Sequence, residues 1–268
     1  MPELPEVELT RRQLRAAMEA ARFETVLVRR GDLRSPLPSD FAARLEGQTV
    51  RALGRRAKYL VVELSSGEIL VMHLGMSGSF AVSKGPVGQL DTHDHVVFQM
   101  SSGKAVVYND PRRFGVMRLL ACDVTSDPVL GALGAEPLEA SFDARSLAAA
   151  LRGRTTTLKA ALSDQRIIAG LGNIYVCEAL HRARLSPRRR ASTLVTRTGA
   201  PRPALRLLVK AIRAVLTDAL SKKRSDSGDR FRVYDREGRR CVRHGCGGTI
   251  RRIVQNGRST FFCPVCQR

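Results

Sequence analysis

Residues 241–266 read CVRHGCGGTIRRIVQNGRSTFFCPVC, and they hold four of the six cysteines of the chain. The four form two pairs with sixteen residues between the pairs, namely Cys241, Cys246, Cys263 and Cys266. A hairpin between the pairs would bring four thiolates together in the closed tetrahedral arrangement of structural zinc. Reduced free thiols and an iron–sulfur cluster are the alternatives, and His244 could replace one sulfur. We predict one structural Zn²⁺ ion held by the four cysteines.

The tail around this pattern is basic and poor in apolar residues. Residues 231–268 hold nine arginines and only two acidic residues. A metal can keep so small a segment folded, because the binding free energy of the ion is also folding free energy. We expect a zinc-bound hairpin that presents Arg251, Arg252 and Arg258.

The basic character extends to the whole chain. Its 268 residues include 45 Lys and Arg against 25 Asp and Glu, a formal net charge of +20. This excess is typical of a protein whose partner is a polyanion. Hydrophobic residues make up 43%, which is enough for a packed core and argues against global disorder. No run of 18 apolar residues is present, so we expect no membrane span.

The N-terminus reads MPELPEVE, an acidic, proline-broken start that does not resemble a signal peptide. We expect a cytosolic chain, in which Cys122 and Cys177 are ordinary core residues. Removal of the initiator methionine would expose the secondary amine of Pro2. Attack of that amine on a sugar aldehyde carbon would give an iminium ion, an electron sink for elimination, with Glu3 as acid or base. Taken alone, these residues favour the simpler interpretation of a lead into a helix.

The spacing of apolar and turn-forming residues divides the chain into a β-rich region and a helical region. From residue 23 to 120, short apolar runs alternate with Gly, Ser, Asp and Pro, which predicts an antiparallel β-sandwich or barrel with hairpin turns at 65–67 and 101–103. The clearest strands are Tyr59–Leu64, Ile69–Leu74, Val96–Met100, Ala105–Tyr108 and Val116–Leu120. Helices are expected over Pro5–Ala21, Ala144–Arg152, Leu158–Leu162, Ile174–Ala183 and Pro203–Leu220. Asn173 is the expected N-cap of the fourth helix, and residues 221–229 are the expected linker.

Three segments of the β region place cations or apolar side chains beside glycine or a turn. They are RRAK at 55–58, HLGMSG at 73–78 and DPRRFG at 110–115. Side chains of these kinds enter the base stack in proteins that kink duplex DNA. For Met76 and Phe114 the alternative is core packing, and for the arginines it is a solvated face.

Together these segments resemble the formamidopyrimidine-DNA glycosylase family, bacterial base-excision enzymes for oxidised purines. The resemblance covers almost the whole chain in order, through Met1–Glu8, Arg55–Tyr59, His73–Gly78, His93–His95, Asp110–Gly115, Gly170–Tyr175 and Cys241–Cys266. The opening MPELPEVE and the terminal cysteine pairs are its most specific parts. With them, the interpretation of Pro2 as a nucleophile is favoured over its interpretation as a lead into a helix.

The resemblance implies roles for individual residues. Pro2 would be the nucleophile at C1′ of the damaged nucleotide, Glu3 the carboxyl that assists ring opening, and Glu6 a supporting acid. Lys58 would be the active-site lysine, and Arg258 the finger arginine that grips the phosphates beside the lesion. The residues that would fill the gap left by the flipped base are Met76, Arg112 and Phe114. Those expected on the phosphate side are His73, Lys159, Asn173 and Tyr175.

The implied fold is a multi-domain α+β architecture. A catalytic β-sandwich with flanking helices is expected over residues 1–125, a helix-two-turn-helix domain over 138–226 and a zinc-finger hairpin over 231–268. The implied activity is that of a bifunctional DNA glycosylase and abasic-site lyase, which forms an iminium on Pro2 and cleaves by β,δ-elimination. The implied partner is double-stranded DNA with oxidised bases or abasic sites, bound by a monomer in the bacterial cytoplasm, at the nucleoid and not at a membrane.

One segment departs from the family pattern. Family members usually carry a longer loop before the finger, whereas here Leu220 runs through SKKRSDSG directly to Asp229. In the family that loop covers an everted oxidised purine, so its shortening favours formamidopyrimidines, hydantoins, bulkier lesions or abasic sites over 8-oxoguanine. Other hypotheses are an endonuclease VIII-like enzyme for oxidised pyrimidines, a non-catalytic binder of damaged DNA and a zinc-ribbon RNA-binding protein. The stretch Leu4–Glu6 argues for the purine branch.

Overall fold

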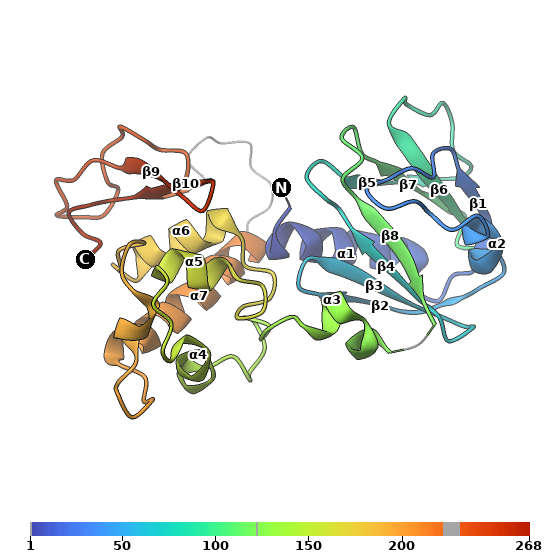
Figure 1. Ribbon diagram of the computed structural model, residues 1–268. Helices are drawn as coiled ribbons and strands as arrows, with labels where there is room; N and C mark the ends of the chain where they lie inside the picture. The colour runs from blue at the N-terminus through green and yellow to red at the C-terminus, as the bar shows by residue number, and fades with distance from the viewer. Residues whose placement is uncertain (1, 122, 222–230) are drawn as a thin grey trace. The chain divides into compact units, whose positions relative to one another are not determined.

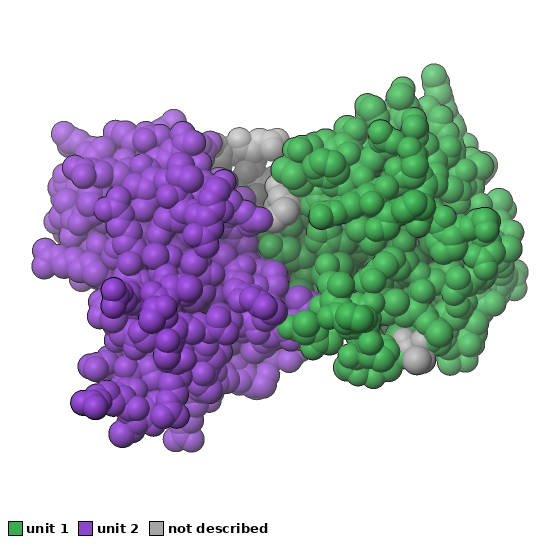
Figure 2. Space-filling model, viewed as in Figure 1, with its two compact units in different colours: residues 1–132 green, residues 133–268 purple. Residues whose placement is uncertain are grey.

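The computed structural model describes residues 2–121, 123–221 and 231–268. Cys122 and residues 222–229 of the expected linker lie outside the described residues. The chain divides into two compact units, unit 1 with residues 1–132 and unit 2 with residues 133–268 (Figure 2).

Unit 1 is an antiparallel β-sandwich, as the sequence predicts (Figure 1). The first sheet has the order β1-β6-β7-β5, with bounds Phe23–Val28 for β1, Ser79–Lys84 for β5, Asp94–Met100 for β6 and Lys104–Asn109 for β7. The second has the order β2-β3-β4-β8, with bounds Val50–Arg56 for β2, Tyr59–Leu64 for β3, Ile69–His73 for β4 and Val116–Leu120 for β8. The predicted turns at 65–67 and 101–103 join β3 to β4 and β6 to β7.

The strands that the sequence did not single out, β1, β2 and β5, are all edge strands. An edge strand is covered by neighbours on one side only, so it needs fewer apolar residues than a central strand. The sequence of β5, SFAVSK, buries only Phe80, and β1 buries only Phe23 and Val26. Their apolar signal is correspondingly weak.

Helix α1 (Leu4–Met18) packs against strands of both sheets. Its buried residues Val7, Leu14 and Met18 join the core between the sheets. A proline in the first turn and a capping box formed by Glu3 and Glu6 begin the helix. This unit also holds the short helices α2 (Phe41–Leu45) and α3 (Pro128–Gly131) and a 3-10 turn at Val124–Ser126.

Unit 2 contains the four predicted helices and the hairpin. The helices are α4 (Ala144–Leu151), α5 (Leu158–Ser163), α6 (Asn173–Arg182) and α7 (Pro203–Ser221), and α6 packs against both α5 and α7. One detail of the sequence prediction is wrong, because the N-cap of α6 is Gly172 and Asn173 is the first helical residue. The side-chain amide of Asn173 instead donates to the carbonyl oxygen of Ser259 at 2.9 Å.

Strands β9 (Arg251–Gln255) and β10 (Arg258–Phe262) form the hairpin of the tail. Gln255 pairs with Arg258, so the loop has two residues, Asn256 and Gly257, both with positive φ. This conformation is that of a type I′ turn, for which Asn-Gly is the favoured sequence. Among the described residues, no helix has both the length and the apolar character that a membrane crossing requires.

Candidate active site and nucleic-acid interface

The N-terminal residues are held by the start of α1. Pro2 is half-buried and Glu3 is only 2% exposed. The carboxylate of Glu6 accepts a hydrogen bond from the backbone N–H of Glu3 at 3.1 Å. Glu6 therefore fixes the backbone next to the imino nitrogen of Pro2, which is a physical basis for the supporting role that the resemblance implies.

A brace that sequence reasoning did not identify joins α1 to the turn that carries Lys58. The carboxylate of Glu8 accepts from Arg11 at 2.9 Å and from Arg55 at 3.3 Å. Although burial opposes ionisation of Glu8, hydrogen bonds from Arg11 and Arg12 hold its pKa at about 2. Arg55 also donates to the carbonyl oxygen of Ala57 at 2.8 Å. Buried Lys58, the next residue, thus has a fixed position relative to α1.

His73 lies at the end of β4, close to the Lys58 turn. Its Nδ1 accepts from the N–H of Gly75 at 3.0 Å, and its ring packs on Tyr59 with 4.7 Å between ring centroids. Burial, together with the positive charges of Lys58 and Arg34, lowers the pKa of His73 to about 4. His73 is therefore neutral at pH 7, so it can orient a phosphate or the loop but adds no positive charge.

We predict that His73 makes unit 1 sensitive to acid. Because the folded pKa is lower than the unfolded value, stability is full above about pH 6.5 and falls as the pH drops towards 4, by at most about 3 kcal/mol. Urea unfolding between pH 7 and pH 4.5 should show a smaller loss for His73→Gln than for the wild type. His93→Gln, at an exposed histidine, is the control and should follow the wild type.

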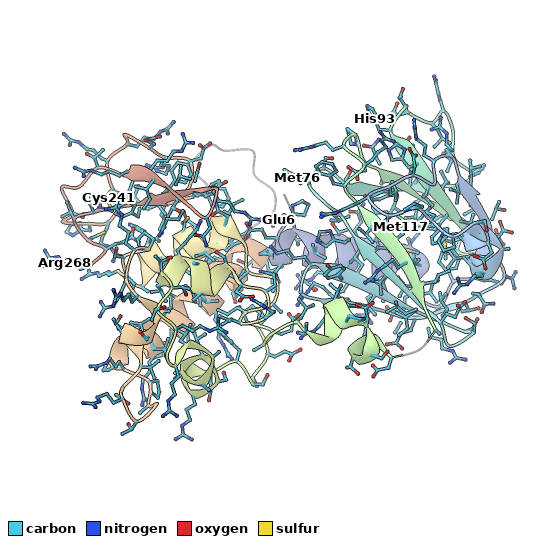
Figure 3. The ribbon with its side chains drawn as sticks, viewed as in Figure 1. Glu6, Met76, His93, Met117, Cys241 and Arg268 are labelled. Carbon is cyan, nitrogen blue, oxygen red and sulfur yellow. The ribbon has the colours of Figure 1, made fainter. Side chains whose placement is uncertain are left out.

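Two apolar side chains proposed for the base stack are exposed. Met76 lies in the loop between β4 and β5 (Figure 3). It is 42% exposed, and Phe114, in the loop between β7 and β8, is 40% exposed. The alternative of core packing is wrong for both. The guanidinium carbon of Arg112 lies 4.8 Å from the centroid of the Phe114 ring. The cation and the ring thus form one projecting group.

The loop that carries Met76 packs directly against the loop that carries Phe114. A Cβ on Gly75 would lie 2.4 Å from the backbone carbonyl atoms of Phe114, so only glycine permits this approach. Below them, the fully buried carboxylate of Asp110 accepts from Ser77 at 2.5 Å, Tyr108 at 3.1 Å and the Gly115 N–H at 2.8 Å. Asp110 therefore joins the Met76 loop to the Phe114 loop.

Sequence reasoning gave Asp110 no separate role. Its signal is a single acidic residue directly after an apolar strand and before Pro-Arg-Arg-Phe-Gly. That pattern cannot show which groups the carboxylate will bind, because Ser77 is 33 residues away in the sequence.

In unit 2, Lys159, Asn173 and Tyr175 lie on α5 and the first turn of α6. Lys159 is 3% exposed and Tyr175 is 2% exposed. Burial lowers the pKa of Lys159, and the positive charge of Arg258 adds to this effect. Lys159 and Arg258 therefore belong to one basic neighbourhood. Arg258 itself is exposed beside the hairpin turn and begins β10.

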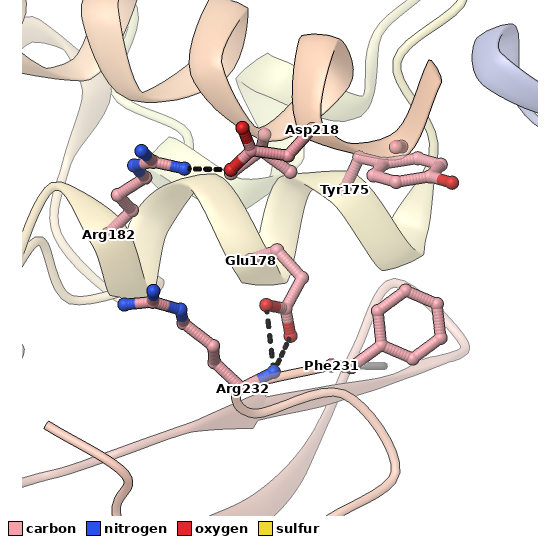
Figure 4. Close-up of a pocket in the computed structure, with 8 residues that line it drawn as sticks. Tyr175, Glu178, Arg182, Asp218, Phe231 and Arg232 are labelled. Atoms are coloured by element: carbon pink, nitrogen blue, oxygen red, sulfur yellow. Dashed lines mark hydrogen bonds and ion pairs between the residues drawn. The ribbon is translucent and has the colours of Figure 1, made fainter. Parts of the chain in front are cut away.

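A pocket adjoins Tyr175, between α6, α7 and the chain at Phe231 (Figure 4). Arg182 and Asp218 form an ion pair of 2.6 Å at its wall. Glu178, on the same helix as Arg182, also lines the pocket, and its carboxylate accepts from the backbone N–H of Arg232 at 3.0 and 3.1 Å (Figure 4). Most polar groups of this pocket thus serve to join α6 to the chain around it.

The four cysteines of the tail come together as predicted. The sulfur atoms of Cys241 and Cys266 are 3.9 Å apart, those of Cys246 and Cys263 are 3.6 Å apart, and all four lie within 4.8 Å of one another. Tetrahedral zinc with Zn–S bonds of about 2.3 Å requires sulfurs about 3.8 Å apart, so the cluster fits the ion. His244 is exposed and lies outside this group.

Ionisation of the four cysteine thiols is unfavourable unless a cation binds them. Burial, together with the neighbouring sulfurs of Cys263 and Cys241, raises the pKa of Cys266 to about 12. A divalent ion offsets this cost because it binds thiolates directly. The cluster therefore holds one structural Zn²⁺, with no open position for a substrate.

Comparison with known proteins assigns all three parts of the chain. Residues 1–117 match the formamidopyrimidine-DNA glycosylase N-terminal domain, residues 133–230 the H2TH domain of the same enzyme, and residues 238–268 the zinc finger found in FPG and IleRS. The H2TH domain is the helix-two-turn-helix domain expected from the sequence.

Full-length relatives and solved structures agree with this assignment. Formamidopyrimidine-DNA glycosylases from Bradyrhizobium sp. strain BTAi1 and Rhodopseudomonas palustris strain HaA2 are each 56% identical, with both chains covered completely. These alignments run over 293 and 292 positions against 268 residues here, so the relatives hold residues that this chain lacks.

Among solved structures, the Lactococcus lactis enzyme bound non-covalently to DNA with an AP site is 30% identical, with a TM-score of 0.87 and full coverage of both chains. A MutM complex with DNA that contains carbocyclic 8-oxo-G has the same identity, coverage and TM-score. The domain matches, the relatives and the zinc cluster agree: the chain belongs to the formamidopyrimidine-DNA glycosylase family.

Proposed function

We propose that this chain is a base-excision DNA repair enzyme, a bifunctional glycosylase and abasic-site lyase for oxidised purines, chiefly formamidopyrimidine and 8-oxoguanine. The observation that carries the proposal is the N-terminal Pro2-Glu3 pair, braced by Glu6 at the start of α1, in a family of formamidopyrimidine-DNA glycosylases. The relatives in complex with lesion-containing DNA support the choice of substrate.

In the proposed reaction, the nitrogen of Pro2 attacks C1′ of the damaged nucleotide as the bond from C1′ to the base breaks, and the proton that the Pro2 nitrogen loses passes to the departing base. The deoxyribose ring opens at C1′–O4′, with Glu3 delivering the proton to O4′, and leaves an iminium ion on Pro2. Loss of a proton from C2′ then expels the 3′ phosphate, and a second elimination expels the 5′ phosphate. Water finally hydrolyses the iminium, which frees Pro2 and releases the unsaturated sugar remnant. The products are the free base, this sugar fragment and a one-nucleotide gap.

The remaining residues bind the DNA in this proposal. Met76, Arg112 and Phe114 occupy the space left by the flipped nucleotide and offset the few kcal/mol of lost stacking. Lys58 and Arg258 approach the lesion and its flanking phosphates. The residues assigned to other phosphate-side contacts are His73, Lys159, Asn173 and Tyr175. The exposure of Met76 and Phe114 supports the first of these assignments.

We assign the chemistry to residues 1–125, the backbone grip to residues 138–226 and the finger to residues 231–268. We further propose that the protein acts as a monomer in the bacterial cytoplasm, at the nucleoid. A monomer suffices because all the proposed site residues come from one chain, and the bacterial relatives support the location.

The central test is covalent trapping on a panel of duplexes. The purified protein is incubated with borohydride and DNA that contains formamidopyrimidine, 8-oxoguanine, a hydantoin, an oxidised pyrimidine or an abasic site. Borohydride reduces the iminium to a stable amine, so a protein–DNA adduct is expected on the purine lesions and the abasic site. Tight binding without any adduct would instead support a non-catalytic damage binder.

The panel also tests the effect of the short segment before Phe231. We expect stronger trapping on formamidopyrimidine than on 8-oxoguanine, because the loop that covers the latter in the family is shortened here. Strongest trapping on the oxidised pyrimidine would favour the endonuclease VIII-like alternative.

We also predict that Arg258→Ala reduces the salt dependence of DNA binding. Each phosphate contact contributes about −0.9 to the slope of log K against log salt, so the loss of one contact should make the slope shallower by about 1. Fluorescence anisotropy on an abasic-analogue duplex from 50 to 300 mM salt measures this slope. Arg15→Ala, at an exposed arginine near the other end of α1 from Pro2, is the control and should keep the wild-type slope.

A further inference from the structure

One face of α6 meets the zinc-binding tail at three levels. Asn173, Cys177 and His181 follow each other at intervals of four residues and so lie on one side of the helix. Asn173 donates to the backbone of β10, and Cys177 belongs to the apolar cluster under the hairpin. At the third level, His181 contacts a metal ligand, since its Nε2 lies 3.3 Å from the sulfur of Cys241.

The surroundings of His181 determine its tautomer. The residue is completely buried, and its Nδ1 has no hydrogen-bond partner within residues 2–121, 123–221 and 231–268. A proton on Nδ1 would be buried without an acceptor, whereas a proton on Nε2 points to the sulfur of Cys241. The neutral ring with Nε2–H is therefore the form that fits, and a metal-bound thiolate can only accept from it.

We propose that His181 supports the zinc site without binding the ion itself. Its Nε2–H donates a hydrogen bond to the thiolate of Cys241, one of the four zinc ligands. Four thiolates and one Zn²⁺ carry a net charge of −2 in a largely buried cluster. A hydrogen bond to one sulfur disperses part of that charge and orients the cysteine. Such supporting contacts typically change metal affinity by about 10- to 100-fold.

Neighbouring contacts hold His181 in place for this role. Arg243, two residues after Cys241, donates to the carbonyl oxygen of His181 at 2.6 Å. One turn earlier on α6, the carboxylate of Glu178 accepts from the backbone N–H groups of Val233 and Tyr234, each at 2.9 Å. The zinc site is thus completed by a helix from outside the finger. This role of His181 concerns the metal alone and is independent of the glycosylase reaction.

The test compares zinc retention in the full-length protein with three substitutions. His181→Phe fills the space but removes the donor, and it should release zinc to a chromogenic chelator with a 10- to 100-fold weaker apparent affinity. His181→Gln keeps an N–H near the position of Nε2 and should retain zinc nearly as the wild type does. His244→Gln is the matched control at the exposed histidine between two ligands, and it should behave as the wild type.

A second measurement separates this role from simple packing. In the Co²⁺-substituted proteins, loss of the N–H···S bond raises the energy of the sulfur lone pairs, so the thiolate-to-Co²⁺ absorption band should move to longer wavelength in His181→Phe only. If His181→Phe does not fold, the smaller His181→Asn takes its place, since its amide is too short to reach the sulfur. Wild-type zinc retention with an unmoved band in either donor-removing variant would overturn the proposal, as would equal zinc loss in His244→Gln.

Discussion

Replacement of Pro2 by glycine is expected to lower the rate of covalent trapping on an abasic duplex by about 100-fold or more while DNA affinity stays within a few-fold of the wild type. Glycine keeps an α-amine but loses the ring that fixes its direction, and misplacement of a reacting group by about 1 Å can cost about 10²-fold. The primary amine also gives an imine that can lose its N–H proton, which removes the permanent cation needed for elimination.

Two measurements check this expectation. Single-turnover borohydride trapping gives the rate, and anisotropy on a duplex with a reduced, unreactive abasic analogue gives the affinity. Pro86→Gly, in an exposed loop between β5 and β6, is the matched control and should retain both. Parallel loss of trapping and of affinity in Pro2→Gly would contradict a nucleophilic role, because it would mean that Pro2 mainly supports the fold.

Replacement of Cys263 by serine is expected to have the largest effect on structure. Cys263 is completely buried and contributes one of the four sulfurs. Structural zinc supplies roughly 10–16 kcal/mol of apparent binding free energy in small zinc-finger peptides, so a three-sulfur site should lose its ion and the β9–β10 hairpin should unfold. Because Arg258 is presented by that hairpin, DNA affinity should fall by about 10- to 100-fold.

Zinc content per chain, measured by elemental analysis, should drop from one to near zero in Cys263→Ser. Amide hydrogen exchange should accelerate in residues 251–262 and remain slow in the sandwich strands of unit 1. The control is Cys177→Ser, which alters a buried cysteine in the same apolar cluster but outside the four-sulfur group. Undiminished zinc content in Cys263→Ser would refute the four-cysteine assignment.

Much of the fold could be predicted because its signals are local. The central strands β3, β4, β6 and β7 are nearly continuous apolar runs between turn residues, and the helices of unit 2 have clear apolar faces. The cysteine pairs likewise predict a zinc hairpin from spacing alone. The edge strands β1, β2 and β5 were harder to detect, because a strand with one neighbour buries few side chains, and β8 is the edge strand that the sequence did predict.

For the candidate site, the sequence predicts the residues and their chemical roles but not the contacts that hold them. The resemblance leads us to propose Pro2 and Glu3 as a reactive pair, but the sequence does not reveal the Glu8–Arg55 ion pair beside the turn that follows β2. His181 illustrates the limit best. As a histidine on an apolar helix it carries no signal of metal chemistry, since its contact with Cys241 spans 60 residues and exists only in the folded chain.

The packing of the Met76 loop against the Phe114 loop bears on how the proposed enzyme would find damaged sites in DNA. Gly75 lets one loop lie against the backbone of the other, and the carboxylate of Asp110 binds both loops. The side chains of Met76 and Phe114 therefore project from one preassembled unit. Because this unit is ordered before binding, it would lose little conformational freedom on entering a DNA helix. In the proposed complex, the deformation needed to open the base stack then comes mainly from the DNA, and the base steps that a lesion has already weakened open first. A preassembled insertion unit would in this way make the proposed enzyme selective for the easily deformed base steps of damaged DNA.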